Sequence, residues 1–187
     1  MKVTYMAAAM LVALTAVRAE PIADFQVLDL RGGSHAFSTL RADTTVIVFI
    51  AARCPVSNAY NQRMESLYKD YSAKGIHFIF LNANFNEPAK EVAEHAKEVG
   101  FTFPVYRDSG NVAALFNAQV TPETFVVDKQ GVIRYHGAID DSQNEARIRK
   151  QGLRNALDEM LAGKPVTVTQ TKAFGCTVKR APRRSTD

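Results

Sequence analysis

The chain has 187 residues, of which 47% are hydrophobic, and a formal net charge of +4. This length suits about one domain of the usual roughly 100 to 200 residues, large enough to bury a core without disulfide staples. So small a charge excess gives no indication of nucleic-acid binding. Because a core of this size needs no disulfide to hold it together, the two cysteines are free for chemistry.

The first 19 residues are typical of a secretory signal peptide. Lys2 precedes an apolar stretch that runs to Ala16, and Val17-Arg18-Ala19 offers the small residues that a signal peptidase prefers. The stretch is shorter than the roughly 20 residues that span a bilayer. We therefore expect cleavage after Ala19, a secreted or periplasmic protein, and no transmembrane segment in the mature chain.

Strand-like and helix-like segments alternate along the rest of the chain, which predicts an α/β fold. Residues 25–30 and 36–40 flank a turn at 31–34 and predict an N-terminal β-hairpin. Residues 45–51 are continuously apolar and β-branched, as expected for a central strand covered by helices on both faces.

The same alternation continues to residue 161. Apolar spacings of three and four predict a helix from Ser57 to Gly75, and Pro88 begins a second helix that runs to Val99. The remaining expected elements are a buried strand over 76–81, a loop over 82–87, a short helix over 112–116, strands over 124–127 and 132–135, and a final helix over 144–161. We expect one domain over 20–165 and a C-terminal extension over 166–187 that carries Cys176 and a solvated basic tail.

Cys54 lies between the apolar strand and the first long helix, where a reactive thiol is expected. The positive end of a helix favours a thiolate, and Arg53 adds a neighbouring cation. Pro55 suits the first helical turn. Ser57 is interpreted as the N-cap of the helix, a role at least as well supported as a hydrogen bond to the sulfur.

Three short motifs accompany this order of elements: Cys54-Pro55-Val56-Ser57, Asn82-Ala83-Asn84-Phe85-Asn86-Glu87 and Gly175-Cys176-Thr177. Together with the segments 103–108 and 120–128, they resemble the thioredoxin-like superfamily, in its redoxin or peroxiredoxin-like branch of alkyl hydroperoxide reductase and thiol-specific antioxidant type. The secreted Cys-Pro-x-Ser group of that branch is the most similar. The resemblance implies a thioredoxin-like fold, with a central mixed sheet flanked by helices.

Two positions depart from the pattern of the superfamily. Ser57 replaces the second cysteine of a thioredoxin, so no local disulfide can form. Ala51 stands where a peroxiredoxin has the threonine that helps to cradle a peroxide. The resemblance therefore implies that Cys54 is the nucleophile of thiol-disulfide exchange with a protein disulfide or thiol reductant, and only secondarily of a weak peroxidase.

The resemblance also assigns a supporting site. Pro122 matches the loop proline that the superfamily holds in cis, whereas most X-Pro bonds are trans. On this basis Thr121 is expected to face Cys54, Pro122 to shape a substrate groove, and the backbone before Pro122 to be free to pair with a peptide substrate.

Cys176 is open to two interpretations. As a resolving cysteine it would finish the exchange as a Cys54–Cys176 disulfide. As one end of a permanent bridge it would instead stabilise the fold by on the order of a few kcal/mol. The chain would then be a non-catalytic module that binds a partner or a copper ion. The preceding Gly175 allows close backbone approach in either case.

The remaining ionisable residues are expected to be structural, and no organic cofactor and no metal site are predicted. The histidines are scattered and form no metal-ligand pair: His35, His77, His95 and His136. Four acidic residues are expected to be solvated loop carboxylates: Glu87, Glu123, Asp140 and Asp141.

Overall fold

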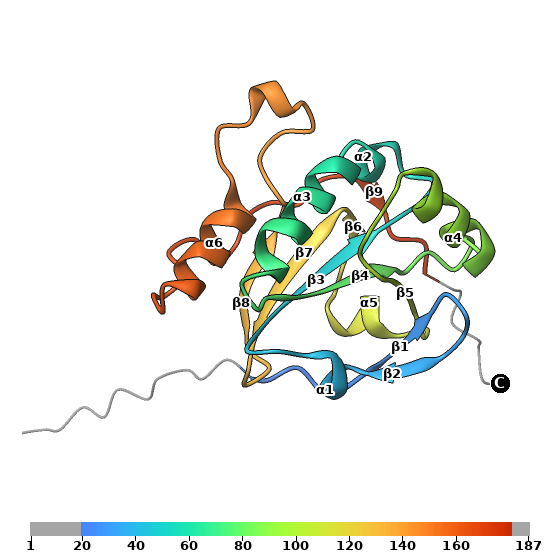
Figure 1. Ribbon diagram of the computed structural model, residues 1–187, viewed down its shortest axis with the longest axis horizontal. Coiled ribbons are helices and arrows are strands. Elements are labelled where there is room, and N and C mark those ends of the chain that lie inside the picture. Colours follow the sequence, from blue (N-terminus) through green and yellow to red (C-terminus); the bar gives the residue numbers. More distant parts are fainter. Residues whose placement is uncertain (1–19, 181–187) are drawn as a thin grey trace, which may run out of the picture.

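A seven-stranded sheet forms the centre of the computed structural model, which describes residues 20–180 (Figure 1). The expected signal peptide and residues 181–187 of the basic tail lie outside the described residues. The strands are β1 (Gln26–Asp29), β2 (Ser34–Ala36), β3 (Thr44–Ile50), β4 (His77–Asn82), β5 (Val105–Asp108), β6 (Val120–Thr121), β7 (Glu123–Asp128), β8 (Ile133–Gly137) and β9 (Cys176–Thr177). The helices are α1 (Phe37–Leu40), α2 (Pro55–Asn58), α3 (Asn61–Ser72), α4 (Ala89–Glu98), α5 (Val112–Leu115) and α6 (Gly152–Leu161).

The main sheet is mixed, as expected, and runs in the order β2-β1-β5-β4-β3-β7-β8. β4 pairs in parallel with β3 and β5, whereas the β1–β2, β1–β5, β3–β7 and β7–β8 pairs are antiparallel. β3 therefore lies inside the sheet with a partner on each side. The strand ends at Ile50, so the chain leaves the middle of the sheet immediately before Cys54.

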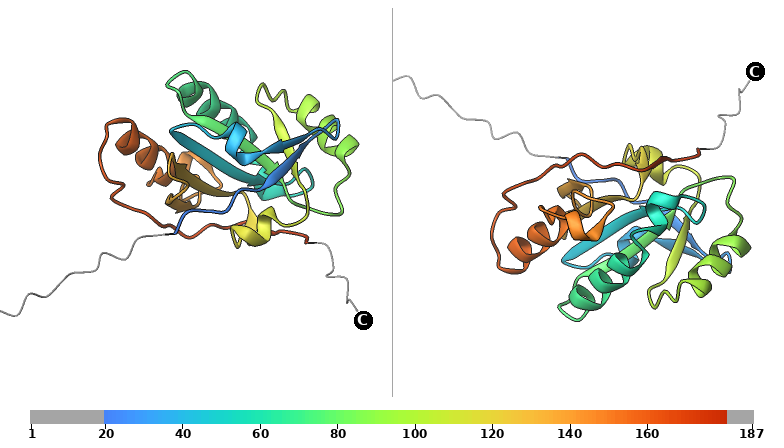
Figure 2. Two further views of the ribbon diagram at one scale, coloured as in Figure 1. Left: turned by 90° about the horizontal axis from the view of Figure 1, so that it is seen from below. Right: turned by 90° about the horizontal axis from the view of Figure 1, so that it is seen from above.

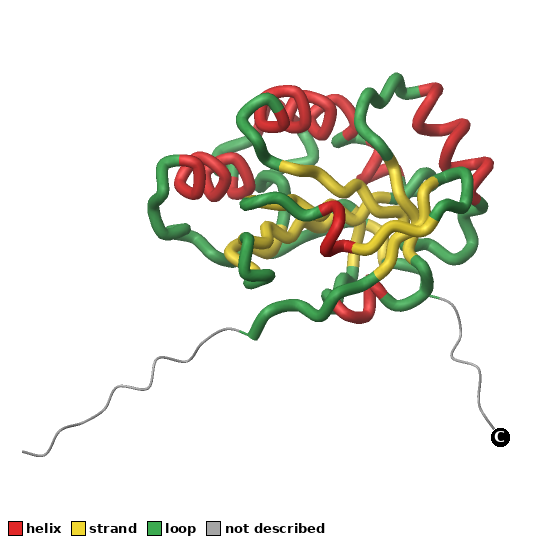
Figure 3. The backbone as a smooth tube through the Cα atoms, turned by 60° about the horizontal axis from the view of Figure 1, so that its bottom comes forward, coloured by secondary structure: helices red, strands yellow, loops and turns green. Residues whose placement is uncertain are grey.

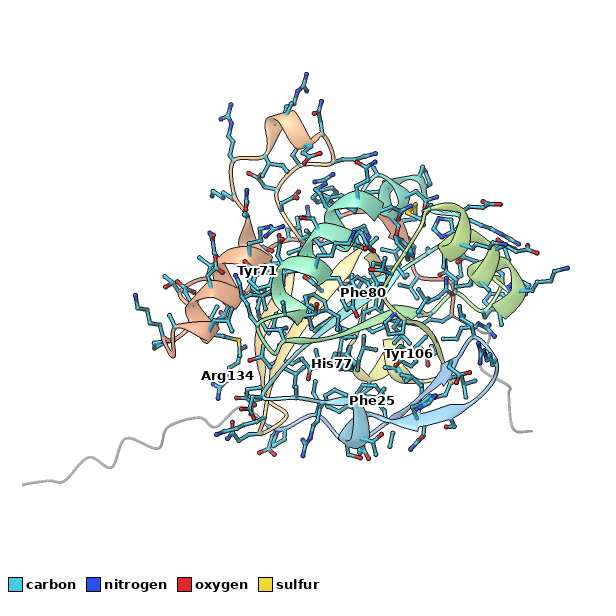
Figure 4. The ribbon with its side chains drawn as sticks, viewed as in Figure 1. Phe25, Tyr71, His77, Phe80, Tyr106 and Arg134 are labelled. Carbon is cyan, nitrogen blue, oxygen red and sulfur yellow. A yellow bond between two sulfur atoms is a disulfide. The ribbon has the colours of Figure 1, made fainter. Side chains whose placement is uncertain are left out.

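Helices cover both faces of the sheet (Figure 3). Along β3, Val46 and Val48 join the apolar cluster under α3, α4 and α6, and Ile47 and Phe49 join the cluster that contains residues of α1 and α5. Burial on both faces explains why residues 46–50 of β3 are apolar without alternation. Figure 4 labels residues of both clusters, among them Phe80 in the cluster under α3 and Phe25 in the cluster that contains residues of α1.

Several elements of the structure differ from the expectations. The return strand of the hairpin ends at Ala36, because the Asp24 carboxylate accepts hydrogen bonds from the Ser38 N–H and hydroxyl and starts the α1 turn. The first long helix is divided into α2 and α3. β5 was missed as a strand, although it joins the hairpin to the rest of the sheet.

The final helix is shorter than the expected 144–161. Only a 3-10 turn over Glu145–Arg147 precedes α6. The Asp141 carboxylate accepts hydrogen bonds from the N–H groups of Arg149 and Lys150, which draws this segment out of helical geometry. The α6 helix therefore begins at Gly152.

Residues 166–180, called here the C-terminal strap, run from the end of α6 along β8 and then across the molecule to α2. His136 donates its N–H to the Thr169 carbonyl and accepts from the Thr171 N–H. Figure 2 shows the strap crossing the molecule in both views, and Figure 1 places β9 between α2 and β6. The strap thereby brings Cys176 to the end of β3. Within residues 20–180, no helix combines the length and the apolar character that crossing a bilayer requires.

Candidate functional site

A disulfide joins Cys54 to Cys176 across 122 residues of sequence. The two Cα atoms are 5.9 Å apart, within the roughly 4.4 to 6.8 Å that a disulfide spans. Cys54 is almost fully buried, with 3% of its surface exposed, whereas Cys176 is half-buried. The bridge that the sequence left as an option is present, and its more accessible end is the Cys176 sulfur.

Cys54 belongs to a tightly bonded turn, residues 51–58, called here the Cys54 turn. Cys54 itself is the N-cap of α2, and its Sγ accepts the Ser57 N–H at 3.3 Å. The interpretation of Ser57 as the N-cap is therefore wrong, because its hydroxyl instead accepts the Ala51 N–H at 3.2 Å. Pro55 occupies the first helical turn, as expected. One N–H group is thus directed at the sulfur, where it would stabilise a thiolate.

Glu87 fixes the beginning of this turn. Its carboxylate, 1% exposed, accepts the N–H of Ala52 at 2.8 Å and the N–H of Arg53 at 3.2 Å. The side chains of Asn82 and Asn84 also donate to it. A buried carboxylate is tolerated where several donors satisfy it, and four donors do so here. The expectation that Glu87 is solvated is wrong.

Asn84 connects the Cys54 turn with the strap. Its side-chain N–H donates to Glu87 at 3.0 Å, and its oxygen accepts the Lys179 N–H at 2.7 Å. The adjacent Phe85 N–H donates to the Lys179 carbonyl at 2.8 Å. The loop over residues 82–87 therefore contacts both segments that carry a cysteine.

The strap occupies the backbone edge beside Pro122. The Thr121–Pro122 bond is cis, as predicted, and the Thr121 carbonyl oxygen lies 3.3 Å from Cys54 Sγ. β6 pairs antiparallel with β9, with Thr121 opposite Cys176. A β-carbon on Gly175 would lie 1.9 Å from the Thr121 oxygen, so only glycine fits there. The edge expected to be free for a peptide is thus filled by the chain itself.

The charges near the disulfide are mostly neutralised. The Arg53 guanidinium pairs with the Glu91 carboxylate, and this hydrogen-bonded cation holds the pKa of Glu91 below its ordinary value. The positive charge that the sequence offered to the thiolate is therefore shared with a carboxylate. The Ser57 N–H is the donor that the structure places on Cys54 Sγ.

A second buried carboxylate supports the β6 edge. Burial acts to raise the pKa of Glu123, but hydrogen bonds from His136, Gln119 and Val120 outweigh it, so this pKa lies below its ordinary value. The His136 ring also stacks on Phe125, with centroids 4.3 Å apart. The expectation that Glu123 is solvated is therefore wrong. Its carboxylate fixes β6, the strand with which β9 pairs.

The expectation that Asp140 is solvated is also wrong, because this carboxylate is buried away from the disulfide and accepts hydrogen bonds from Tyr60 and Arg63. Asp141 is exposed, as expected. Residues 20–180 contain no group of three or more His, Cys, Asp or Glu side chains that could hold a metal ion.

The sequence matches the model of the AhpC/TSA family over residues 19–136. A thiol-disulfide oxidoreductase, ResA, from Geobacillus kaustophilus is 30% identical over 112 residues, which are 59% of this chain and 63% of the relative. The chain thus spans just under two thirds of the length of that relative.

Solved structures have the same fold. An uncharacterized conserved protein from Geobacillus kaustophilus is 29% identical, with a TM-score of 0.80 over 88% of this chain and 92% of that one. A thiol:disulfide interchange protein of the thioredoxin family from Chlorobium tepidum is 19% identical, with a TM-score of 0.62 over 79% of this chain and 99% of that one, and supports the fold alone. The fold is thioredoxin-like and carries the Cys54–Cys176 disulfide, and the chain belongs to the AhpC/TSA family.

Proposed function

We propose that this protein is an exported thiol-disulfide oxidoreductase in which Cys54 exchanges with a protein disulfide or dithiol and Cys176 resolves the mixed disulfide. The observation that carries the proposal is the pairing of β9 with β6, which places Cys176 against Cys54 beside cis-Pro122. A substrate peptide linked to Cys54 would use the same backbone edge. The named activity of the ResA relative agrees with this assignment.

The proposed exchange has two steps. In the reduced protein, the Cys54 thiolate attacks a disulfide R–S–S–R′, a Cys54–S–S–R bond forms, and R′–S⁻ leaves and takes up a proton. The Cys176 thiolate then attacks Cys54 Sγ, which forms the Cys54–Cys176 bridge and releases R–S⁻. The substrate gains two electrons and the protein loses them. An external dithiol returns them, first reaching the bridge at its less buried end, Cys176.

Disulfide exchange is favoured over peroxide reduction in this site. Ala51 brings no hydroxyl to the Cys54 turn, and its N–H is bonded to Ser57. The Arg53 guanidinium is paired with Glu91. The donors that would stabilise a departing peroxide oxygen are therefore not assembled at the sulfur.

The supporting roles follow from the geometry. Ser57 would stabilise the Cys54 thiolate through its N–H, and Pro55 would fix the helical turn that presents it. Thr121 would align a substrate backbone, with Pro122 shaping the groove. Export rests on residues 1–19, and a secreted or periplasmic location would provide an oxidising environment for the bridge.

Single-cysteine variants test the proposal. Reduced protein is mixed with a peptide that contains one disulfide, and the products are followed by mass. Cys54→Ser is expected to abolish exchange, and Cys176→Ser to accumulate a one-to-one mixed disulfide at Cys54. Full exchange in both variants would sink the proposal. A wild-type bridge that mild reductant opens only in denaturant would favour the non-catalytic module.

Copper binding is the other outcome of that alternative. Isothermal titration with Cu(I), of the protein with its bridge intact and of the reduced protein, would reveal such a site and show whether it uses the thiolates that Cu(I) prefers. The proposed function predicts that exchange in the native state proceeds without any added metal.

A further inference from the structure

Cys176 must stay near Cys54 when the disulfide is open if it is to resolve a mixed disulfide. The contacts that could hold it lie mainly on the strap residues that follow it. The Val178 side chain is 6% exposed and its N–H donates to the Gln119 carbonyl at 2.9 Å. Lys179 is bonded at both its N–H and its carbonyl to the loop over residues 82–87.

Asn84 provides the side-chain contact between the loop over residues 82–87 and Lys179. The residue is 7% exposed, so neither end of its amide is satisfied by bulk water. Its oxygen accepts from Lys179, and its nitrogen donates to Glu87. Only a carboxamide of this length offers an acceptor on one side and a donor on the other.

We propose that Asn84 is a positioning residue for the resolving step and keeps Cys176 beside Cys54 while the disulfide is open. The Glu87 carboxylate that orients Asn84 also accepts the N–H of Arg53, the residue before Cys54. One amide thus links the backbone preceding one cysteine to the backbone following the other. This inference rests on the proposed function, because it concerns the second step of that exchange.

Asn84 acts by raising the effective concentration of the Cys176 thiolate at Cys54 Sγ. The Cys176 thiolate attacks Cys54 Sγ within one molecule, so the rate and the equilibrium depend on how often the strap is in place. Loss of the Asn84 amide leaves the Lys179 N–H without its acceptor and frees this part of the strap to move away. The first step, attack by Cys54 on an external disulfide, does not involve Asn84.

Asn86 is the matched control. It is the same residue type in the same loop, it is exposed, and the structure gives its side chain no hydrogen-bond partner. Asn86→Ala therefore removes the same atoms as Asn84→Ala without removing the contact with the strap.

The test measures the full-length protein at equilibrium with reduced and oxidised glutathione, which yields the effective molarity of Cys176 toward Cys54. Asn84→Ala is expected to lower it about tenfold, the scale of one buried hydrogen bond. Asn86→Ala is expected to stay within about twofold of wild type. Equal values for the two variants would overturn the proposal.

A second measurement separates positioning from general loosening of the Cys54 turn. The rate of Cys54 attack on oxidised glutathione is compared in Cys176→Ser and in Cys176→Ser with Asn84→Ala. The two rates are expected to agree within about twofold, and an equal tenfold loss here would overturn the positioning role. If Asn84→Ala does not fold, Lys179→Pro removes the same hydrogen bond from the strap side and should give the same fall in effective molarity.

Failure of the inference differs from failure of the proposed function. A wild-type bridge that does not exchange with glutathione in the native state overturns both. A wild-type bridge that exchanges normally, with no difference between Asn84→Ala and Asn86→Ala, overturns only the role of Asn84.

Discussion

The two ends of the disulfide lie in regions of different construction. The Cys54 turn follows a central strand, and the N–H groups of residues 51–53 are each bonded to a buried side chain. Around Cys176 the strap forms two-residue pairing with β6, supplemented by the contacts of Val178 and Lys179 and by a hydrogen bond from the Arg180 side chain to the Ala118 carbonyl. The core of the fold thus determines the position of one sulfur, and a few contacts determine the position of the other.

This difference assigns separate roles to the two regions. Local opening is easiest where few apolar contacts and few backbone hydrogen bonds must break. A partner that approaches the bridge would therefore displace the strap and leave the Cys54 turn in place. Changes in the turn should affect both redox forms of the protein equally, whereas a change that strains the strap should cost more in the oxidised form, where the disulfide ties the strap in place.

The largest effect is expected from Glu87→Gln. The amide would bring a donor among four donors, so buried N–H groups would lose their acceptor, at a cost of about 2–3 kcal/mol in the free energy of unfolding. Urea unfolding of oxidised and reduced protein should show this loss in both. Glu91→Gln, at a partly exposed carboxylate on α4 that pairs with Arg53, is the control and should leave stability close to that of wild type. A loss confined to the oxidised form would contradict the role given to the turn.

Gly175→Ala should affect the strap alone. The added methyl group would collide with the Thr121 oxygen, so β9 could not pair with β6 as it does. The oxidised protein should lose about 2 kcal/mol of stability, as in overpacked sites. The reduced protein should lose less, because its strap is not tied by the disulfide and can move away from the clash. Thr177→Ala, at an exposed position of the same strand, is the control. Equal losses in both redox forms would show that the reduced strap depends on this close contact as well.

Val178→Ala measures the apolar anchor of the strap. Removing two buried methyl groups should cost about 1.5 kcal/mol. Val168→Ala, at a position of the strap with 53% exposure, should stay within about 0.5 kcal/mol of wild type. Thermal unfolding of the oxidised forms compares the two, and identical melting temperatures would remove Val178 from the anchors.

The smallest effect is expected from Glu123→Gln, in the way the free energy of unfolding falls at acid pH. Because the pKa of Glu123 is lowered in the folded state, its contribution to stability is fully present above the ordinary glutamate value of 4.5. That contribution is lost as the pH falls from this value through the lowered pKa. Glu123→Gln should therefore show a shallower decline of stability with acid than wild type. Parallel declines would mean that Glu123 does not contribute to the stability of the β6 edge.

The sequence was sufficient for the features that depend on local pattern or on the resemblance. The unbroken apolar run over 45–51 predicted the central strand, and the resemblance predicted cis-Pro122. The Cys54–Cys176 bridge was an option that the sequence left open. Gly175 was correctly linked with a close backbone approach. Single residues or short runs of sequence are enough to predict these features.

The sequence was insufficient where burial depends on partners far along the chain. Glu87 is buried because N–H groups of Ala52 and Arg53, about 35 residues earlier, meet it at the end of β3. The residues beside Glu87 in the sequence give no sign of those donors. β9 was missed for a similar reason, since two residues carry no periodicity and pair only because the strap crosses the molecule. The Asn-rich motif over residues 82–87 was noticed, but its link to Lys179 was not.

The separation of 122 residues between the two cysteines also sets an order of events during synthesis. At the usual 5 to 20 residues per second, a ribosome adds Cys176 about 6 to 24 s after Cys54. Throughout that interval the nascent chain carries a lone thiol at the end of its central strand. The newly made protein therefore carries a single thiol at first. Cys54 can form a bridge within its own chain only after the segment with Cys176 has been added.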